Sequence, residues 1–220
     1  MTAPPSTSRR QGKARQRKLS AVILAAGVAS RFSGTKQLAE IGGKALIRRV
    51  IDAIPEEEVR EIVVVLGHDA ASISSSLDEK GLRIVVNRNY RDGMSSSIRA
   101  GIFALAGGSQ GAMLLLADQP FITKALIRRM IKLFEAESAK ARIVAIAHGD
   151  VVSPPAIFSR KYFRELAALG GDQGAKFVIL RHSGEVSLVK VRSKAVFADV
   201  DTRADLAAVR RLLLEAGKTR

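Results

Sequence analysis

Short apolar runs of strand length recur along this chain, and segments with a helical spacing of apolar residues separate them. The runs are residues 19–25, 62–66 and 112–117, further strands are expected at 82–86 and 142–147, and the helical segments are 46–54, 69–78, 95–105 and 126–134. Strands that are apolar throughout, rather than alternating, are buried on both faces, and parallel strands need crossover helices of this kind. The pattern predicts an α/β fold with a three-layer, doubly wound and mostly parallel sheet.

The first 18 residues differ in composition from the rest. They carry six basic and no acidic residues, so they account for +6 of the net charge of +15. Because they lack apolar periodicity, we expect a disordered basic arm over 1–18, followed by one domain over 19–220. The arm has no apolar core of a secretory signal, and no run reaches the roughly 18–20 apolar residues that span a bilayer. We therefore expect a cytoplasmic protein without membrane contact.

The last third of the chain is less regular. Ser153-Pro154-Pro155 is expected to break any regular element, and Gly170-Gly171 to form a loop. Thr202 and Asp205 have the spacing of a capping box, which predicts that a final helix begins there.

The loops that follow the strands are the candidate functional site, because ligands of open α/β sheets collect at the carboxyl ends of the strands. Cysteine is absent, which excludes a disulfide scaffold, a Cys-zinc site and a thiol nucleophile. The first loop, residues 24–38, matches neither the Walker A nor the GxGxxG pattern. Its small residues, with Arg31 and Lys36, could cradle phosphates, and a surface loop with two solvated cations fits equally well.

Three acidic residues are candidates for a metal site. Asp118 directly follows the most apolar run, where a carboxylate must be hydrogen-bonded, paired or metal-bound. Because the chain has no Cys and only three isolated His, its available metal ligands are oxygen atoms, which favour a hard cation such as Mg²⁺. Asp199 and Asp201 alternate in an extended segment and so point to one face. The alternatives are a turn cap for Asp118 and simple solvent exposure for the other two.

The remaining polar clusters allow two interpretations each. Ser95, Ser96 and Ser97 at a helix start could offer donors to an anion, or could merely cap the helix. The arginine pairs are expected to be solvated helix faces, although an anionic small molecule could use them; they are Arg48-Arg49, Arg128-Arg129 and Arg210-Arg211.

Six segments occur in the order found in the molybdenum cofactor nucleotidyltransferases: LAAGVASRFSGTKQL, GMSSSIRAGI, ADQPFIT, SPPAIF, GDQGAK and DVDTRADL. The chain resembles most closely the cytidylyltransferases of this family, which convert molybdopterin to its cytosine dinucleotide form. The resemblance covers residues 20–215. LAAG with Arg and Lys is shared with the wider NTP-transferase superfamily, whereas GMSSS, ADQP and GDQGA together are more specific. The resemblance implies the Rossmann-like fold of the nucleotide-diphospho-sugar transferases.

The resemblance also implies a reaction: a phosphate of molybdopterin attacks the α-phosphorus of CTP, and pyrophosphate leaves. Mg²⁺ would be the cofactor, and a molybdenum hydroxylase or its maturation factor would receive the product. The implied catalytic residues are Arg31, Lys36 and Asp118. The implied nucleotide-binding residues are Leu24, Ala25, Ala26, Gly27, Arg31, Lys36, Ser95 and Asp118, and Asp118 would hold the metal with Asp199 or Asp201.

The chain departs from the family pattern at one position, and one further site, for the acceptor, can be assigned. The family usually has Gly two residues after the Arg, where Ser33 stands here and Gly34 follows, so a positive φ at this position would strain Ser33. We expect the acceptor to dock over residues 153–176. There Gln173 could read the pterin and Lys176 could meet its phosphate.

Other functions stay open at this point. LAAG rather than LAGG favours cytidine, but guanylyl transfer and transfer to another phosphorylated acceptor remain alternatives. A basic nucleic-acid-binding protein is the alternative of a different class. The chain shows no RNP-like aromatic pattern, zinc spacing or helix-turn-helix signature, and its charge cluster lies in the arm.

Overall fold

The structure is a computed structural model that describes residues 18–28, 31–32, 34–77, 81–136 and 143–218. All but Lys18 of the expected basic arm, and Ser33 with its expected strain, lie outside the described residues. Gly34, which is described, has a φ of +108°.

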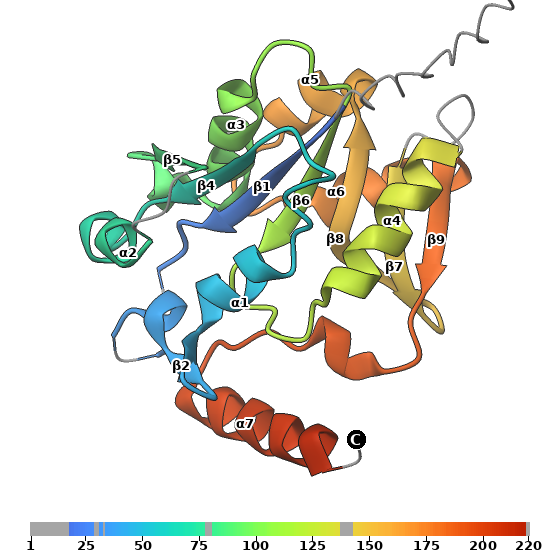
Figure 1. The fold of residues 1–220 in the computed structure, drawn as a ribbon. Coiled ribbons are helices and arrows are strands. Elements are labelled where there is room, and N and C mark those ends of the chain that lie inside the picture. The colour runs from blue at the N-terminus through green and yellow to red at the C-terminus, as the bar shows by residue number, and fades with distance from the viewer. Residues whose placement is uncertain (1–17, 29–30, 33, 78–80, 137–142, 219–220) are drawn as a thin grey trace, which may run out of the picture.

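Seven strands of the described chain form one sheet in the order β5-β4-β1-β6-β8-β7-β9 (Figure 1). They are β5 (Leu82–Val86), β4 (Ile62–Leu66), β1 (Leu19–Ala25), β6 (Gly111–Leu116), β8 (Val151–Ser159), β7 (Ile143–His148) and β9 (Val186–Lys190). β8 is antiparallel to both of its neighbours, and the other pairs are parallel. The expected mostly parallel α/β sheet is confirmed.

Helices cover both faces of this sheet. α1 (Leu46–Asp52), α2 (Ala70–Ser76) and α4 (Lys124–Ala136) pack on one face, and α3 (Met94–Ala104), α5 (Phe163–Ala167) and α6 (Ala175–Arg181) pack on the other. β1 serves both layers, because Ala21 and Ile23 face the first set of helices while Val22 faces the second. The three-layer arrangement is thereby confirmed, and the helix group seen around α3 in Figure 1 is the second layer.

A third, smaller hydrophobic cluster lies beside the sheet. The two-residue strands β2 (Glu40–Ile41) and β3 (Lys44–Ala45) form a hairpin that packs near α7 (Arg203–Lys218). Phe32, Ile41, Val200 and Leu206 are buried together there. The cluster joins the loop after β1 to the C-terminal helix. No helix in the described residues is long and apolar enough to cross a membrane.

Two expectations for the last third have opposite outcomes. The capping box is confirmed, because Asp205 Oδ2 accepts hydrogen bonds from the Thr202 N–H and hydroxyl, and Thr202 Oγ1 accepts one from the Asp205 N–H. The expectation that Ser153-Pro154-Pro155 breaks any element is wrong, because these residues lie inside β8. The β7–β8 register jumps there, so that Ser153 and Ala156 face consecutive residues of β7. The two prolines occupy this irregularity, where no ladder N–H is required of them.

Candidate functional site

A cavity of about 540 Å³ opens where β1 and β6 end. Residues 24–28 and 116–118, which are the last residues of these strands and those directly after them, form its floor. The rest of its wall includes Lys36, Gln37, Tyr90, Arg91, Gly93, Met94, Ser97, Asp172, Asp199 and Asp201. The carboxyl edge of the sheet therefore brings together most of the residues singled out in the sequence, from segments that are far apart along the chain.

Lys36 is the centre of charge in this cavity. Its Nζ donates to Asp118 Oδ2 at 2.6 Å and to Asp201 Oδ1 at 2.9 Å, and its side chain is only 12% exposed. Burial alone would lower the pKa of Lys36, but the charges and hydrogen bonds of the two carboxylates outweigh it and leave the pKa raised. Lys36 is thus held as a protonated ammonium between two acids.

Gln37 fixes the position of Lys36. The two residues lie on the 3₁₀ helix η1 (Lys36–Leu38), and Gln37 is buried. Gln37 Nε2 donates to the carbonyl oxygens of Ala25 at 3.0 Å and Gly27 at 3.4 Å. The amide thereby ties η1 to the small-residue loop that forms the floor of the cavity. Sequence reasoning missed this residue, although its place directly after the candidate lysine was a signal.

Arg31 lies at the edge of the site. Its Nη2 donates to Asp201 Oδ2 at 3.1 Å, and its side chain is 69% exposed. Within the described part of the chain, Arg31 does not belong to the cavity wall. Asp201 is therefore paired with two cations, Lys36 and Arg31.

Asp199 differs from Asp201 because, among the described residues, its hydrogen-bond partner is an amide and not a cation. Gln119 Nε2 donates to Asp199 Oδ1 at 3.0 Å. Burial, helped by the negative charge of Asp118, raises the pKa of Asp199 to about 6. The second oxygen of Asp118, Oδ1, is buried and has no hydrogen-bond partner in the described structure.

These three carboxylates do not form a ready cage for a metal. Among the described residues there is no group of three or more His, Cys, Asp or Glu side chains that could hold a metal ion. Asp201 pairs with Lys36 and Arg31, and Asp118 pairs with Lys36 through Oδ2 but keeps Oδ1 unpartnered. Among the described residues, no cation is paired with Asp199. Two carboxylate ligands suit Mg²⁺, which commonly takes one or two carboxylates together with substrate phosphates and water. Metal ligation stays a prediction.

The serines at the start of α3 have a structural role that differs from simple capping. The N-cap position is Gly93, and no side chain caps it. Ser97 lines the cavity, whereas Ser95 is buried and its N–H donates to the Gly171 carbonyl at 3.1 Å. Asn87 Nδ2 donates to the hydroxyls of Ser96 and Ser97. The cluster thus joins α3 to the loops beside it, and nucleotide binding by Ser95 remains a prediction.

The residues expected to bind the acceptor lie outside the cavity wall as far as the structure describes it. Gln173 and Lys176 are both exposed, and Gln173 Oε1 accepts a hydrogen bond from the Gly170 N–H at 3.2 Å. Their neighbour Asp172 does line the cavity. The loop that carries Gln173 therefore borders the site, and the two acceptor roles stay predictions. Asp172 lies in the quoted GDQGAK segment but was given no role there, and Tyr90 and Arg91 were missed because nothing in their local sequence distinguishes them from ordinary turn residues.

Comparison with known proteins gives the chain a family context. The profile of the MobA-like NTP transferase domain matches residues 21–186. Nicotine blue oxidoreductase from Paenarthrobacter nicotinovorans is 27% identical over 190 residues, which cover 82% of this chain and 91% of that protein.

Solved structures share the fold. Rv0371c from Mycobacterium tuberculosis is 27% identical with a TM-score of 0.79, over 88% of this chain and 97% of that one. The same protein in complex with manganese has a TM-score of 0.73 at 25% identity, over 88% of this chain and 98% of that one. Molybdopterin-guanine dinucleotide biosynthesis protein A from Archaeoglobus fulgidus has a TM-score of 0.66 at 19% identity, over 89% and 99% of the two chains, and shows the fold alone.

Proposed function

The chain belongs to the MobA-like NTP transferase family, and from this membership we propose that it transfers CMP from CTP to molybdopterin with release of pyrophosphate. The family supports nucleotidyl transfer in general. The choice of CTP and of molybdopterin rests on the resemblance of the loop segments to the cytidylyltransferases.

The observation that carries the proposal is the charge arrangement around Lys36. A protonated lysine, two adjoining carboxylates and a floor of small residues lie together at the carboxyl edge of the sheet. Nucleotidyl transfer needs positioning and charge neutralisation more than a nucleophilic side chain, so a protein without cysteine can perform it.

The proposed mechanism assigns each side chain a task. An oxygen of the acceptor phosphate attacks the α-phosphorus of CTP, and the bond from that phosphorus to the β-phosphate oxygen breaks. Lys36 stabilises negative charge on the phosphates as a fixed donor in a largely buried position. Arg31, which is exposed and paired with Asp201, is free to swing onto the leaving pyrophosphate. The backbone of Leu24, Ala25, Ala26 and Gly27 reads the base, and Ser95 supports the start of α3 beside it.

The residues fit a divalent cation, because within the described part of the chain Asp118 Oδ1 is a buried oxygen without a partner and Asp199 is paired with no cation. We assign Asp118 and Asp199 as the ligands and Asp201 as the partner of Lys36 and Arg31. A bound Mg²⁺ would neutralise phosphate charge and polarise the reacting phosphate. The manganese complex of Rv0371c supports a divalent cation in a protein of this fold.

We place the acceptor over the loop that carries Asp172 and Gln173, because Asp172 lines the cavity. Gln173 would read the pterin edge, and Lys176 would meet the phosphate. A molybdenum hydroxylase or its maturation factor would then take up the product.

A redox reaction is the second candidate, because one relative similar over 91% of its length is an oxidoreductase. Guanylyl transfer is the third, since the base is read by backbone atoms in this proposal. Pyrophosphate release separates the first and third candidates from the second, because a redox enzyme would release none.

The deciding experiment measures pyrophosphate release with CTP, GTP, ATP and UTP, each with and without molybdopterin, in Mg²⁺ or Mn²⁺ buffer. We expect release only with CTP, molybdopterin and a divalent cation together. Release with GTP alone among the nucleotides would favour guanylyl transfer. Release with none of the four would overturn nucleotidyl transfer to this acceptor.

A further inference from the structure

We propose that a second cavity, between the β2–β3 hairpin and α7, binds a small phosphomonoester. The cavity measures about 380 Å³ and is lined by Ile41, Gly42, Arg49, Arg210 and Leu213. None of these residues belongs to the wall of the nucleotide cavity described above. Its volume falls within the range of small-ligand sites, about 300–1,000 Å³.

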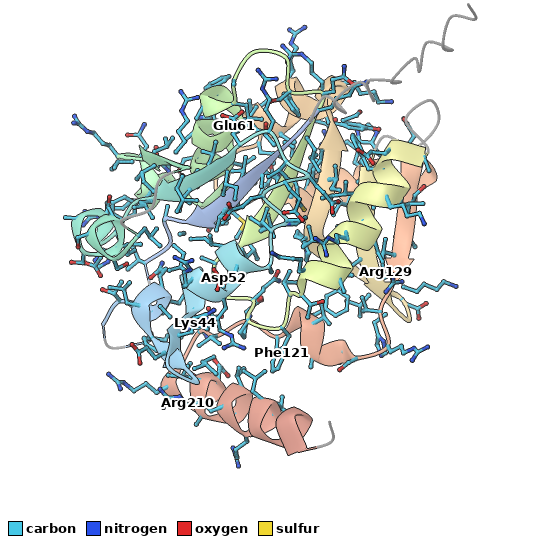
Figure 2. The ribbon with its side chains drawn as sticks, in the orientation of Figure 1. Lys44, Asp52, Glu61, Phe121, Arg129 and Arg210 are labelled. Atoms are coloured by element: carbon cyan, nitrogen blue, oxygen red, sulfur yellow. The ribbon has the colours of Figure 1, made fainter. Side chains whose placement is uncertain are left out.

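Two guanidinium groups give this cavity its charge. Arg49 comes from α1 and Arg210 from α7, and Figure 2 shows Arg210 next to the hairpin that carries Lys44. Among the described residues, no Asp or Glu side chain lines the cavity. Two cations that share a cavity without a carboxylate repel each other, and an anion placed between them would relieve that repulsion. The expectation that these arginines are merely solvated helix faces is therefore incomplete.

Backbone carbonyls hold the two guanidinium groups in place. Arg49 Nη1 donates to the Ile41 carbonyl at 3.0 Å, and Arg210 donates through Nε and Nη2 to the Glu40 carbonyl at 3.1 and 2.7 Å. These contacts orient the side chains without neutralising their charge. Arg128, by contrast, is paired with Glu57 and Glu58. Arg49 and Arg210 are thus positioned before any ligand arrives.

Arg49 also keeps an unpaired donor. Its Nε is buried and has no hydrogen-bond partner within the described structure. A buried donor without a partner is costly. Guanidinium groups match phosphate oxygens in geometry as well as in charge, and a dianion balances two arginines where a single carboxylate would balance one.

The apolar part of the wall indicates that the ligand carries an organic body. Ile41 is buried, and Leu213 is half-buried at the side of α7 that faces the hairpin. A phosphomonoester can place its phosphate on the two arginines and its body against these side chains. A free phosphate ion would leave the apolar wall in contact with water.

Binding is tested by isothermal titration calorimetry of the full chain with inorganic phosphate and with phenyl phosphate, at constant ionic strength set with sodium chloride. We expect phenyl phosphate to bind more tightly, by roughly threefold or more, because its ring buries apolar surface. We expect Arg49→Lys and Arg210→Gln each to weaken binding about tenfold, because each removes charge-assisted hydrogen bonds.

Two matched variants make the test specific. Arg211→Gln removes the same charge from the next position of α7, and Lys36→Ala removes the cation of the nucleotide cavity; both should change the affinity less than twofold. The proposal is overturned if Arg211→Gln weakens binding as much as Arg210→Gln, or if Lys36→Ala abolishes it. Equal affinity for inorganic phosphate and phenyl phosphate would overturn the proposal that the ligand is a phosphomonoester. Should Arg49→Lys fail to fold, Arg210→Gln gives the same decision.

Discussion

Lys36 is the residue on which the proposed chemistry depends most. Lys36→Ala should slow pyrophosphate release by roughly a hundredfold to a thousandfold, because it removes a preorganised donor from a site shielded from water. Lys36→Arg should restore only part of the rate, since a planar guanidinium does not replace a compact ammonium between Asp118 and Asp201. Initial rates with saturating CTP measure both effects.

The control for Lys36 is Lys132→Ala, which removes the same charge from an exposed position of α4. It should keep the wild-type rate. A Lys36→Ala protein with a lowered melting temperature and an unchanged rate would show that this lysine only neutralises the two acids.

Asp199 should make the stability of the metal-free protein depend on pH. Its pKa in the folded chain is about 6, above the ordinary 3.8, so folding favours the protonated form. That contribution to stability is fully present below about pH 4 and is lost as the pH rises through about 6. Asp199→Asn cannot ionise and should flatten this part of the profile. Melting temperatures in a chelating buffer from pH 4 to about pH 7.5 measure it.

Asp150→Asn, at an exposed turn, is the matched variant for Asp199 and should leave the profile unchanged. If Asp199→Asn shows the same slope as the wild type, Asp199 does not titrate in this range. The carboxylate would then have an ordinary pKa, and its need for a cation would disappear.

At the scale of elements, the sequence predicts strands better than connections. The segments that became β1, β4, β6 and β7 are identified within one residue because they are mostly apolar and buried. β5 is identified equally well, although it lies at the edge of the sheet and its positions are half-buried or exposed. β8 was obscured because Pro154 and Pro155 normally interrupt a strand, and only the irregular pairing with β7 accommodates them. The β2–β3 hairpin has two-residue strands, which are too short to show any periodicity.

In the candidate site, the sequence likewise identifies individual residues better than the contacts between them. Lys36 and Asp118 stood out by residue type and by position after a strand. Their pairing with Asp201 could not be read from the sequence, because it depends on how the segment before α7 folds back onto β6. The Val200 N–H donates to the Asp118 carbonyl at 3.1 Å, and this contact brings Asp201 to the lysine.

The junction between α3 and the loop after α5 should be intolerant of substitution. Gly93 has a φ of +95°, and a Cβ there would lie 2.3 Å from the Gly171 carbonyl oxygen. Gly93→Ala should therefore destabilise the protein by about 1–3 kcal/mol and displace the loop that carries Asp172. Thermal unfolding and the Michaelis constant for CTP should both change. Gly107→Ala, which meets nothing within 4 Å, is the control; similar losses in both variants would contradict a local clash.

At the scale of the whole molecule, the proposed function requires two substrates to share one edge of the sheet. In that proposal the cavity at the ends of β1 and β6 holds the charges for the triphosphate, and the loop that carries Gln173 borders it next to the start of α3. If the nucleotide binds in the cavity and the acceptor binds over the loop with Gln173, a substitution in that loop should affect the acceptor alone. The double variant Gln173→Ala with Lys176→Ala should raise the Michaelis constant for molybdopterin about tenfold, because it removes a charge-assisted contact to phosphate.

The Michaelis constant for CTP should stay within about twofold in the same variant, because neither side chain belongs to the described wall of the nucleotide cavity. Steady-state rates with each substrate varied in turn give both constants. Arg164→Ala, at an exposed position of α5 on the same side of the sheet, is the matched loss of charge and should change neither. An equal rise in both constants would mean that the loop also positions the nucleotide, and the proposed place of the acceptor would then be wrong.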